Sequence, residues 1–129
     1  MLAHEDLTGN IIGAAIEVHK AIGPGLLEDL YENALCLELH HREISFQRQV
    51  AMPVFYRDSQ VGLYRLDLLV ADTIVVELKA VTRIADIHFV TFRTYLHAAK
   101  KEHALLLNFG NPKLEAKRVQ ATRFQLKAV

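Results

Sequence analysis

The sequence predicts an α/β fold, a mixed central β-sheet flanked by helices, formed by residues 1–129 as a single domain. Two observations lead to this prediction. Segments with helical periodicity come before and between segments with strand character, an order that suits a mixed sheet with helices on its faces. The segment Ala104 to Phe109 is almost wholly apolar, which is typical of a central strand covered on both sides.

Three helices are expected. The first begins after Thr8, a plausible N-cap, and ends at Gly23-Pro24-Gly25. Its apolar positions at helical spacing are Ile12, Ala15, Ile16, His19 and Ile22. The second helix runs from about Leu26 to Arg42, with a predicted core face of Leu27, Leu30, Ala34, Leu37 and Leu39. The third runs from about Asp86 to Lys100, with an apolar stripe of Phe89, Phe92, Leu96 and Ala99.

The predicted strands form a meander in the middle of the chain. Its members are Ile44 to Val50, Pro53 to Tyr56, Val61 to Val70 and Thr73 to Ala80. Residues 57–60 are a polar turn within this meander. After the apolar strand at 104–109, one or two short strands are expected around Arg118 to Ala121 and Arg123 to Leu126.

Composition restricts the class of protein. The single Cys36 excludes an internal disulfide and is expected to be a buried filler. No apolar run approaches the ~20 residues that span a bilayer, and the acidic N-terminus is unlike a signal peptide, so we expect a cytoplasmic protein without a membrane segment. Residues 1–43 carry eight acids and two bases, whereas residues 100–129 carry two acids and seven bases. The pI near 7.1 is nevertheless low for a dedicated nucleic-acid binder.

The most informative pattern is Asp67 followed, ten positions later, by Glu77-Leu78-Lys79. Side chains on a strand alternate, so Arg65, Asp67 and Leu69 are expected on one face of their strand, and Thr73, Val75, Glu77 and Lys79 on one face of the next. A three-residue turn of Ala71, Asp72 and Thr73 would pair Val70 with Ile74 and place Asp67 opposite Glu77, whereas a two-residue turn would place it opposite Val76. Directly opposed residues have Cβ atoms roughly 4.5–5.5 Å apart, so two carboxylates placed there repel and favour a cation between them.

Two interpretations of this pattern remain open. In the first, Asp67 and Glu77 bind a divalent metal, and Lys79 acts beside it on an anionic substrate. In the second, Arg65 lies opposite Lys79, and the four charges form diagonal ion pairs on a solvated sheet face.

A third acid, Glu28, opens the second predicted helix, and Tyr31 lies three residues later on the same face. Glu28 and Tyr31 can form one polar site, although an acid in a first helical turn is also favourable with the helix dipole. Glu32 is expected to be a surface charge. His88 opens the third helix, where it can face the polar side of the sheet.

Four segments resemble a known family. They are IIGAAIEVHKAIGPGLLEDLY (11–31), YRLDLLV (64–70), IVVELKAV (74–81) and ALLLNFG (104–110). In this order they resemble the small GxxExxY proteins, which are assigned to the PD-(D/E)XK nuclease-like superfamily, over roughly residues 7–120. The resemblance implies a restriction-endonuclease-like αβββαβ core.

The resemblance also implies roles for individual residues. Asp67 and Glu77 match the acidic metal ligands, Lys79 the catalytic lysine, and Glu28 the helix-borne acid that completes the metal site. Mg²⁺ or Mn²⁺ would then activate water for attack on a phosphodiester of DNA or RNA. Tyr31 and Arg65 would support the site or contact the substrate.

The third helix departs from the family pattern at one position. His88 and Tyr95 match the family, but Thr91 stands where the family has a glutamine that helps to orient the site. Threonine is shorter and cannot reach as far as glutamine.

Three functions are therefore compared. The first is a Mg²⁺- or Mn²⁺-dependent nuclease. The second is a non-catalytic, self-associating interaction or assembly module that keeps the nuclease-like fold and forms a homo-oligomer through apolar surface near Leu105 to Phe109. The third is nucleic-acid binding without cleavage, for which the sequence offers no strong basic stripe.

Overall fold

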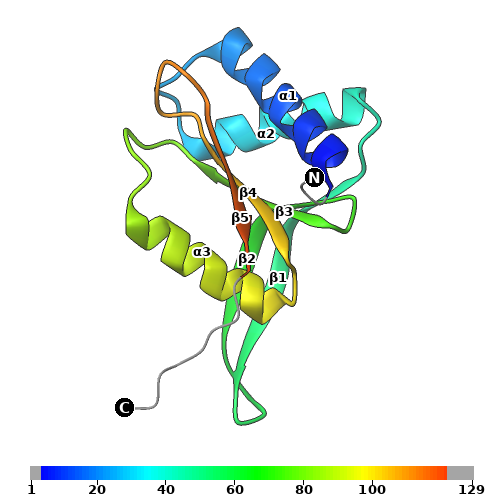
Figure 1. The fold of residues 1–129 in the computed structure, drawn as a ribbon, viewed down its shortest axis with the longest axis vertical. Helices are drawn as coiled ribbons and strands as arrows, with labels where there is room; N and C mark the ends of the chain where they lie inside the picture. The colour runs from blue at the N-terminus through cyan, green and yellow to red at the C-terminus, as the bar shows by residue number, and fades with distance from the viewer. Residues whose placement is uncertain (1–3, 122–129) are drawn as a thin grey trace.

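The computed structural model describes residues 4–121 and arranges them as a mixed sheet with helices over both faces (Figure 1). Its elements are, in chain order, α1 (Glu5–Ile22), α2 (Glu28–His41), β1 (Phe46–Tyr56), β2 (Ser59–Val70), β3 (Ile74–Lys79), α3 (Asp86–Ala99), β4 (His103–Asn108) and β5 (Glu115–Gln120). These elements confirm the predicted α/β class. The predicted strand at Arg123 to Leu126 lies outside the described residues.

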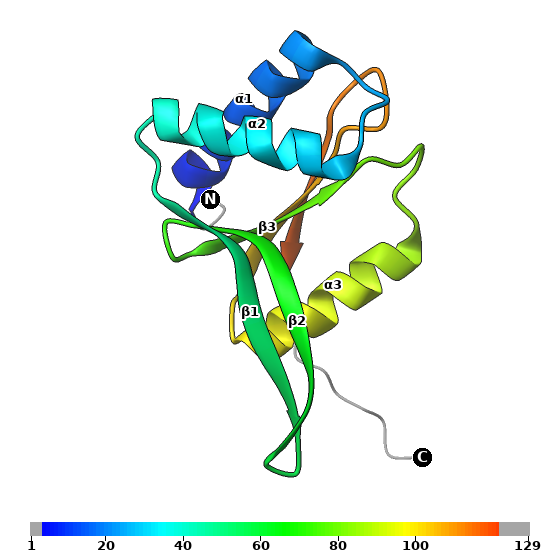
Figure 2. The ribbon, with the colours of Figure 1, turned by 180° about the vertical axis from the view of Figure 1, so that it is seen from behind.

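The strands lie side by side in sequence order, β1-β2-β3-β4-β5. Neighbours are antiparallel except for β3 and β4, which are parallel. A parallel pair needs a crossover connection, and α3 supplies it on one face of the sheet. Helices α1 and α2 cover the other face, as the two opposite views show (Figures 1 and 2).

Strand β3 lies between two apolar cores. Ile74, Val76 and Leu78 face the core under α1 and α2, while Val75 faces the core under α3. Strand β4 divides in the same way, which confirms that it is a central strand covered on both faces. The prediction that Leu105 to Phe109 offers apolar surface for self-association is therefore wrong, because Leu105, Leu106, Leu107 and Phe109 are fully buried within the chain itself.

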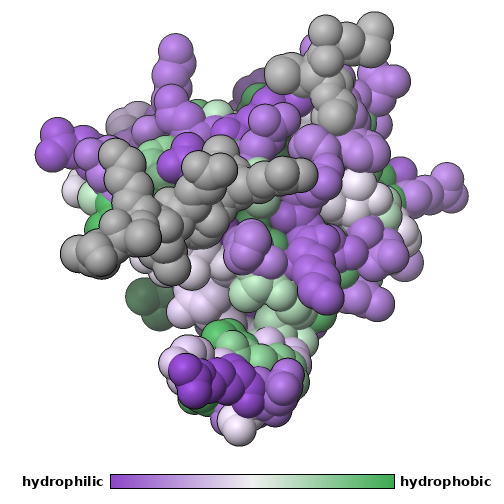
Figure 3. Space-filling view, turned by 60° about the horizontal axis from the view of Figure 1, so that its bottom comes forward, coloured by the Kyte–Doolittle hydropathy of each residue, from purple (hydrophilic) through white to green (hydrophobic). Residues whose placement is uncertain are grey.

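The hairpin of β1 and β2 projects beyond the helices. Strand β1 is continuous where the sequence predicted two segments, and the turn residues Arg57 and Asp58 have left-handed backbones. The outer half of the hairpin leaves large apolar side chains exposed, namely Phe55, Tyr56, Val61 and Leu63. In Figure 3, hydrophobic surface adjoins the hydrophilic tip of this projection.

The rotation of the first two helices differs from the prediction. Thr8 is not an N-cap: α1 already begins at Glu5, and the Thr8 hydroxyl donates to backbone carbonyls within the helix. Several predicted core residues are exposed instead, namely Ile16, Ile22, Leu27, Leu30 and Leu37. The faces that meet the sheet are those of Ile11, Ala14, Val18, Leu35 and Cys36. Among the described residues no helix has the length and apolarity needed to cross a membrane.

A polar clamp, formed by Asn108 and Gly110 against Val81, joins the chain after β3 to the end of β4 and the chain just beyond it. The Asn108 side chain, fully buried, donates to the Val81 carbonyl at 2.8 Å and accepts from the Val81 N–H at 3.0 Å. Next to it, a Cβ added to Gly110 would lie 2.2 Å from the Val81 carbonyl oxygen. The backbone directly after Lys79 is thus held against β4 by contacts that only glycine permits.

We expect Gly110→Ala to lower the free energy of unfolding by at least about 2 kcal/mol, because the new methyl group overlaps Val81 backbone atoms. Chemical denaturation measures this loss. Gly62→Ala is the matched control, since a Cβ at Gly62 meets nothing within 4 Å. Equal stability of the two variants would show that the clamp is not close-packed.

Candidate metal and active site

Glu77 is a buried carboxylate on the central strand. Its exposed fraction is 6%, and it lies on the face of β3 that packs against α3. Burial, a hydrogen bond with Asp67 and the charge of Asp67 raise the pKa of Glu77 to about 9. The Tyr64 hydroxyl donates a hydrogen bond to Glu77 Oε2 at 2.9 Å. Without a cation, Glu77 therefore keeps its proton at neutral pH.

Asp67 reaches Glu77 through the predicted register. Val70 pairs with Ile74, which confirms the three-residue turn, and its residues Ala71 and Asp72 have left-handed backbones. Counted outward from the turn, the backbone pairing of β2 with β3 ends at Leu68, so Asp67 is the first residue of β2 beyond it. There the carboxylate itself continues the connection, because Asp67 Oδ2 accepts the Leu78 N–H at 2.9 Å. The strands thus separate where the two acids meet.

The alternation of β2 is interrupted at Asp67. Leu66 and Leu69 both face the core under α3, although an uninterrupted strand would place them on opposite faces. On β1, Gln49 has a left-handed backbone (φ 48°), and Gln49 and Asp67 are both left unpaired between the pairs Arg48–Leu68 and Val50–Leu66, with no change of register. The faces of β2 thus change where Asp67 lies opposite this irregular residue.

The predicted face of Arg65, Asp67 and Leu69 is therefore wrong. Tyr64, not Arg65, shares the α3 side with Glu77. Arg65 is exposed, and its guanidinium donates to the Gln49 carbonyl at 3.4 Å. Within residues 4–121, no ion pair joins Arg65, Asp67, Glu77 and Lys79, so the predicted lattice of diagonal ion pairs does not form.

Lys79 and Glu28 complete the charged cluster. Lys79 is half-buried at the end of β3, and its charge acts on Glu28, the first residue of α2. Partial burial raises the pKa of Glu28, the positive charge of Lys79 lowers it, and the charge of Asp67 raises it. The structure thus brings Glu28, Asp67, Glu77 and Lys79 into electrostatic contact from three elements.

A small pocket of about 80 Å³ opens beside Glu77 and Lys79. Helix α3 contributes His88, Thr91 and Phe92 to its wall. His88 Nδ1 accepts the Ala85 N–H at 3.0 Å, so this ring nitrogen is occupied in starting α3. Thr91 is exposed at the pocket, and Tyr95 stacks on Tyr64 with ring centroids 3.4 Å apart.

Tyr31 does not share a polar face with Glu28, contrary to the prediction. It is fully buried, and its ring stacks on Phe109. Its hydroxyl donates to the Gly23 carbonyl at 2.6 Å and accepts the Leu26 N–H at 3.1 Å. Tyr31 therefore holds the loop that leads into α2, and in this way it fixes where Glu28 begins the helix.

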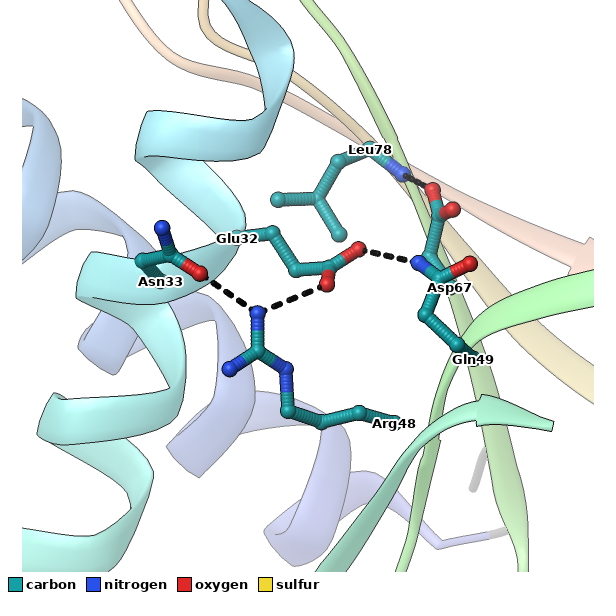
Figure 4. A network of polar contacts seen from close by, with 6 residues as sticks. All are labelled: Glu32, Asn33, Arg48, Gln49, Asp67 and Leu78. Carbon is teal, nitrogen blue, oxygen red and sulfur yellow. Dashed lines mark hydrogen bonds and ion pairs between the residues drawn. The ribbon is translucent and has the colours of Figure 1, made fainter.

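A polar network beside Asp67 was missed from the sequence. Glu32, expected at the surface, is buried and accepts hydrogen bonds from Arg48 at 2.9 Å and from Gln49 at 2.7 Å. Figure 4 shows this network together with the hydrogen bond between Asp67 and Leu78. The one available signal was that Glu32 follows Glu28 by a helical turn; nothing in the sequence connects it to β1. Tyr64 was also missed, although it precedes Asp67 by three residues on the same strand.

The donor set fits a divalent metal. In the described part of the chain no three acidic, histidine or cysteine side chains lie close enough together to hold an ion. Magnesium, however, keeps several waters and is commonly bound through one or two carboxylates. Asp67 and Glu77 supply two hard oxygen donors, and the raised pKa of Glu77 marks a place where a cation is favourable.

The metal-free protein should lose stability as pH rises. The pKa of Glu77 is about 9 in the folded protein, and its ordinary value is 4.5. At pH values between these two, the folded state therefore binds one proton more than the unfolded state. The stability that this proton contributes is complete below the ordinary pKa and is lost as pH rises toward the folded one. Denaturation in the presence of a chelator should show that the free energy of unfolding of wild type falls relative to that of Glu77→Gln, by roughly 1.4 kcal/mol per pH unit between about pH 5 and 8. Parallel pH profiles would contradict the raised pKa.

Comparison with known proteins gives one match. A family model described as the PD-(D/E)XK nuclease superfamily matches residues 5–119, which include every helix and nearly all of β5. No curated protein and no solved structure matches the chain.

Proposed function

The chain belongs to the PD-(D/E)XK nuclease superfamily, and from this premise we propose that it hydrolyses phosphodiester bonds of DNA or RNA with Mg²⁺ or Mn²⁺. The observation that carries the proposal is the pair of buried Glu77 and half-buried Asp67, with Lys79 two residues beyond Glu77 at the end of β3. Two neighbouring carboxylates in an apolar sheet are otherwise a poor structural choice.

Asp67 and Glu77 would hold the metal, and Glu28, at the start of α2, would add negative charge near the ion without ligating it in this geometry. The chemistry that such an ion supplies when bound is a more acidic water and a polarised phosphoryl oxygen. The hydrogen bond from Leu78 N–H fixes one oxygen of Asp67, so its second oxygen is free to point at the ion.

Lys79 would act on the substrate. Lys79 lines the pocket beside Glu77, and from there its ammonium group would orient the attacking water and offset charge that develops on the phosphoryl oxygens. Because Lys79 also acts electrostatically on both Glu28 and Glu77, its charge reduces repulsion among the acids.

The size of the pocket indicates how a substrate would bind. A volume of about 80 Å³ is well below the several hundred Å³ typical of small-molecule sites. It accommodates a hydrated ion or phosphate oxygens and excludes a nucleotide base. The nucleic acid would therefore lie across the surface on the α3 side, near His88, Thr91 and Tyr95, whereas Arg65 lies on the other side of β2 and is no longer proposed as a phosphate contact.

We expect Glu77→Gln and Lys79→Met to reduce cleavage of single- or double-stranded oligonucleotides by about 100-fold or more. Calorimetry with Mn²⁺ separates their roles: Glu77→Gln should lose affinity for the ion, and Lys79→Met should keep it. Asp72→Asn is the matched control, because Asp72 is an acid in the turn that joins β2 to β3, and its side chain is 89% exposed. Absence of Mn²⁺ binding by wild type at millimolar concentration would refute the proposal.

A second candidate is a self-associating module without catalysis. An apolar groove of about 340 Å³ between α1 and α2 favours it, with Ile22 and Leu37 exposed along its wall. Light scattering over a dilution series should then show an oligomer that Leu37→Lys converts to monomer. A wild-type monomer at all concentrations would remove this candidate and leave the nuclease proposal untouched.

A further inference from the structure

Tyr64 connects the buried acid to helix α3. Its hydroxyl donates to Glu77 Oε2 at 2.9 Å, and its ring lies on the α3 side of β2. That position depends on the irregularity at Asp67, because an uninterrupted strand would point Tyr64 to the opposite face from Asp67.

The ring of Tyr64 is fixed from the other side by Tyr95. The two rings are nearly parallel, at 5°, with centroids 3.4 Å apart. Because a tyrosine side chain has only two rotatable angles before its ring, stacking determines where the hydroxyl lies. Helix α3 thereby sets the position of a donor that contacts Glu77 on β3.

We infer that Tyr64 is a positioning residue for the candidate metal site: its hydroxyl holds the Glu77 carboxylate in the orientation it needs beside Asp67, and Tyr95 holds the hydroxyl in place. This inference rests on the proposed function, since it assigns Glu77 as a ligand. Glutamate has three side-chain torsions, so without a fixed donor its carboxylate can turn away from a shared ion. Hydrogen bonds to ligating groups commonly change metal affinity by about 10- to 100-fold.

A further observation supports a donor role for Tyr64. Thr91 lines the same pocket, but among the described residues it makes no hydrogen bond to Glu77. The contact from β2 thus supplies what the shorter threonine on α3 does not.

The experiment compares two matched deletions of a hydroxyl. Tyr64→Phe removes the donor to Glu77 and keeps both rings; Tyr95→Phe also keeps both rings and removes a hydroxyl with no hydrogen bond in the described part of the chain. Calorimetry should show Mn²⁺ affinity lowered about 10- to 100-fold in Tyr64→Phe and unchanged in Tyr95→Phe. Oligonucleotide cleavage should show lower kcat with unchanged KM, and thermal unfolding should confirm that both variants fold.

Unchanged Mn²⁺ affinity in Tyr64→Phe would overturn the inference, and so would an equal loss in both variants, which would assign the effect to the stacked pair as packing. These outcomes differ from failure of the proposed function. If wild type itself binds no Mn²⁺, the nuclease proposal and the role of Tyr64 fall together. If wild type binds the ion as tightly as Tyr64→Phe, only the role of Tyr64 is lost.

Discussion

Strand β3 is covered by apolar side chains on both faces and paired along both edges, yet it carries a carboxylate. An acid in such a place must be given a proton, hydrogen-bond donors or a cation. The surroundings of Glu77 follow from this requirement: its raised pKa keeps its proton, Tyr64 donates from β2, and Lys79 brings positive charge. The clamp at Asn108 and Gly110 then fixes the backbone just beyond, so the end of the strand cannot move away from these groups.

The parts of this arrangement that depend on neighbouring residues could be predicted from the sequence. The turn after Val70 determines the register of β2 and β3, and a run of apolar residues identified β4 as central. What could not be predicted depends on distant partners. The face of Tyr64 changes where Asp67 lies opposite Gln49, a residue of another strand with a left-handed backbone, and Glu32 is paired with Arg48 from β1. Neither leaves a periodic signal in the sequence.

The helices show the same division. The apolar stripe of α3 was predicted correctly, since Phe92 and Leu96 are buried and polar residues separate them from the opposite face. In α2, leucines occur all round the helix, so the pattern cannot select the face that packs on the sheet. The face is chosen by the loop that Tyr31 holds, and this leaves Leu27 and Leu37 at the surface.

The parallel pairing of β3 with β4 has a consequence for synthesis. Strand β3 can pair with β2 as soon as residue 79 is free of the ribosome, but its second partner ends at Asn108, beyond the whole of α3. At roughly 5–20 residues per second, those intervening residues take on the order of 1 to 6 seconds to appear. During this interval Glu77 lies on an open sheet edge, with backbone groups that a strand from another nascent chain can join. Chaperone cover is therefore needed most between the translation of β3 and that of β4.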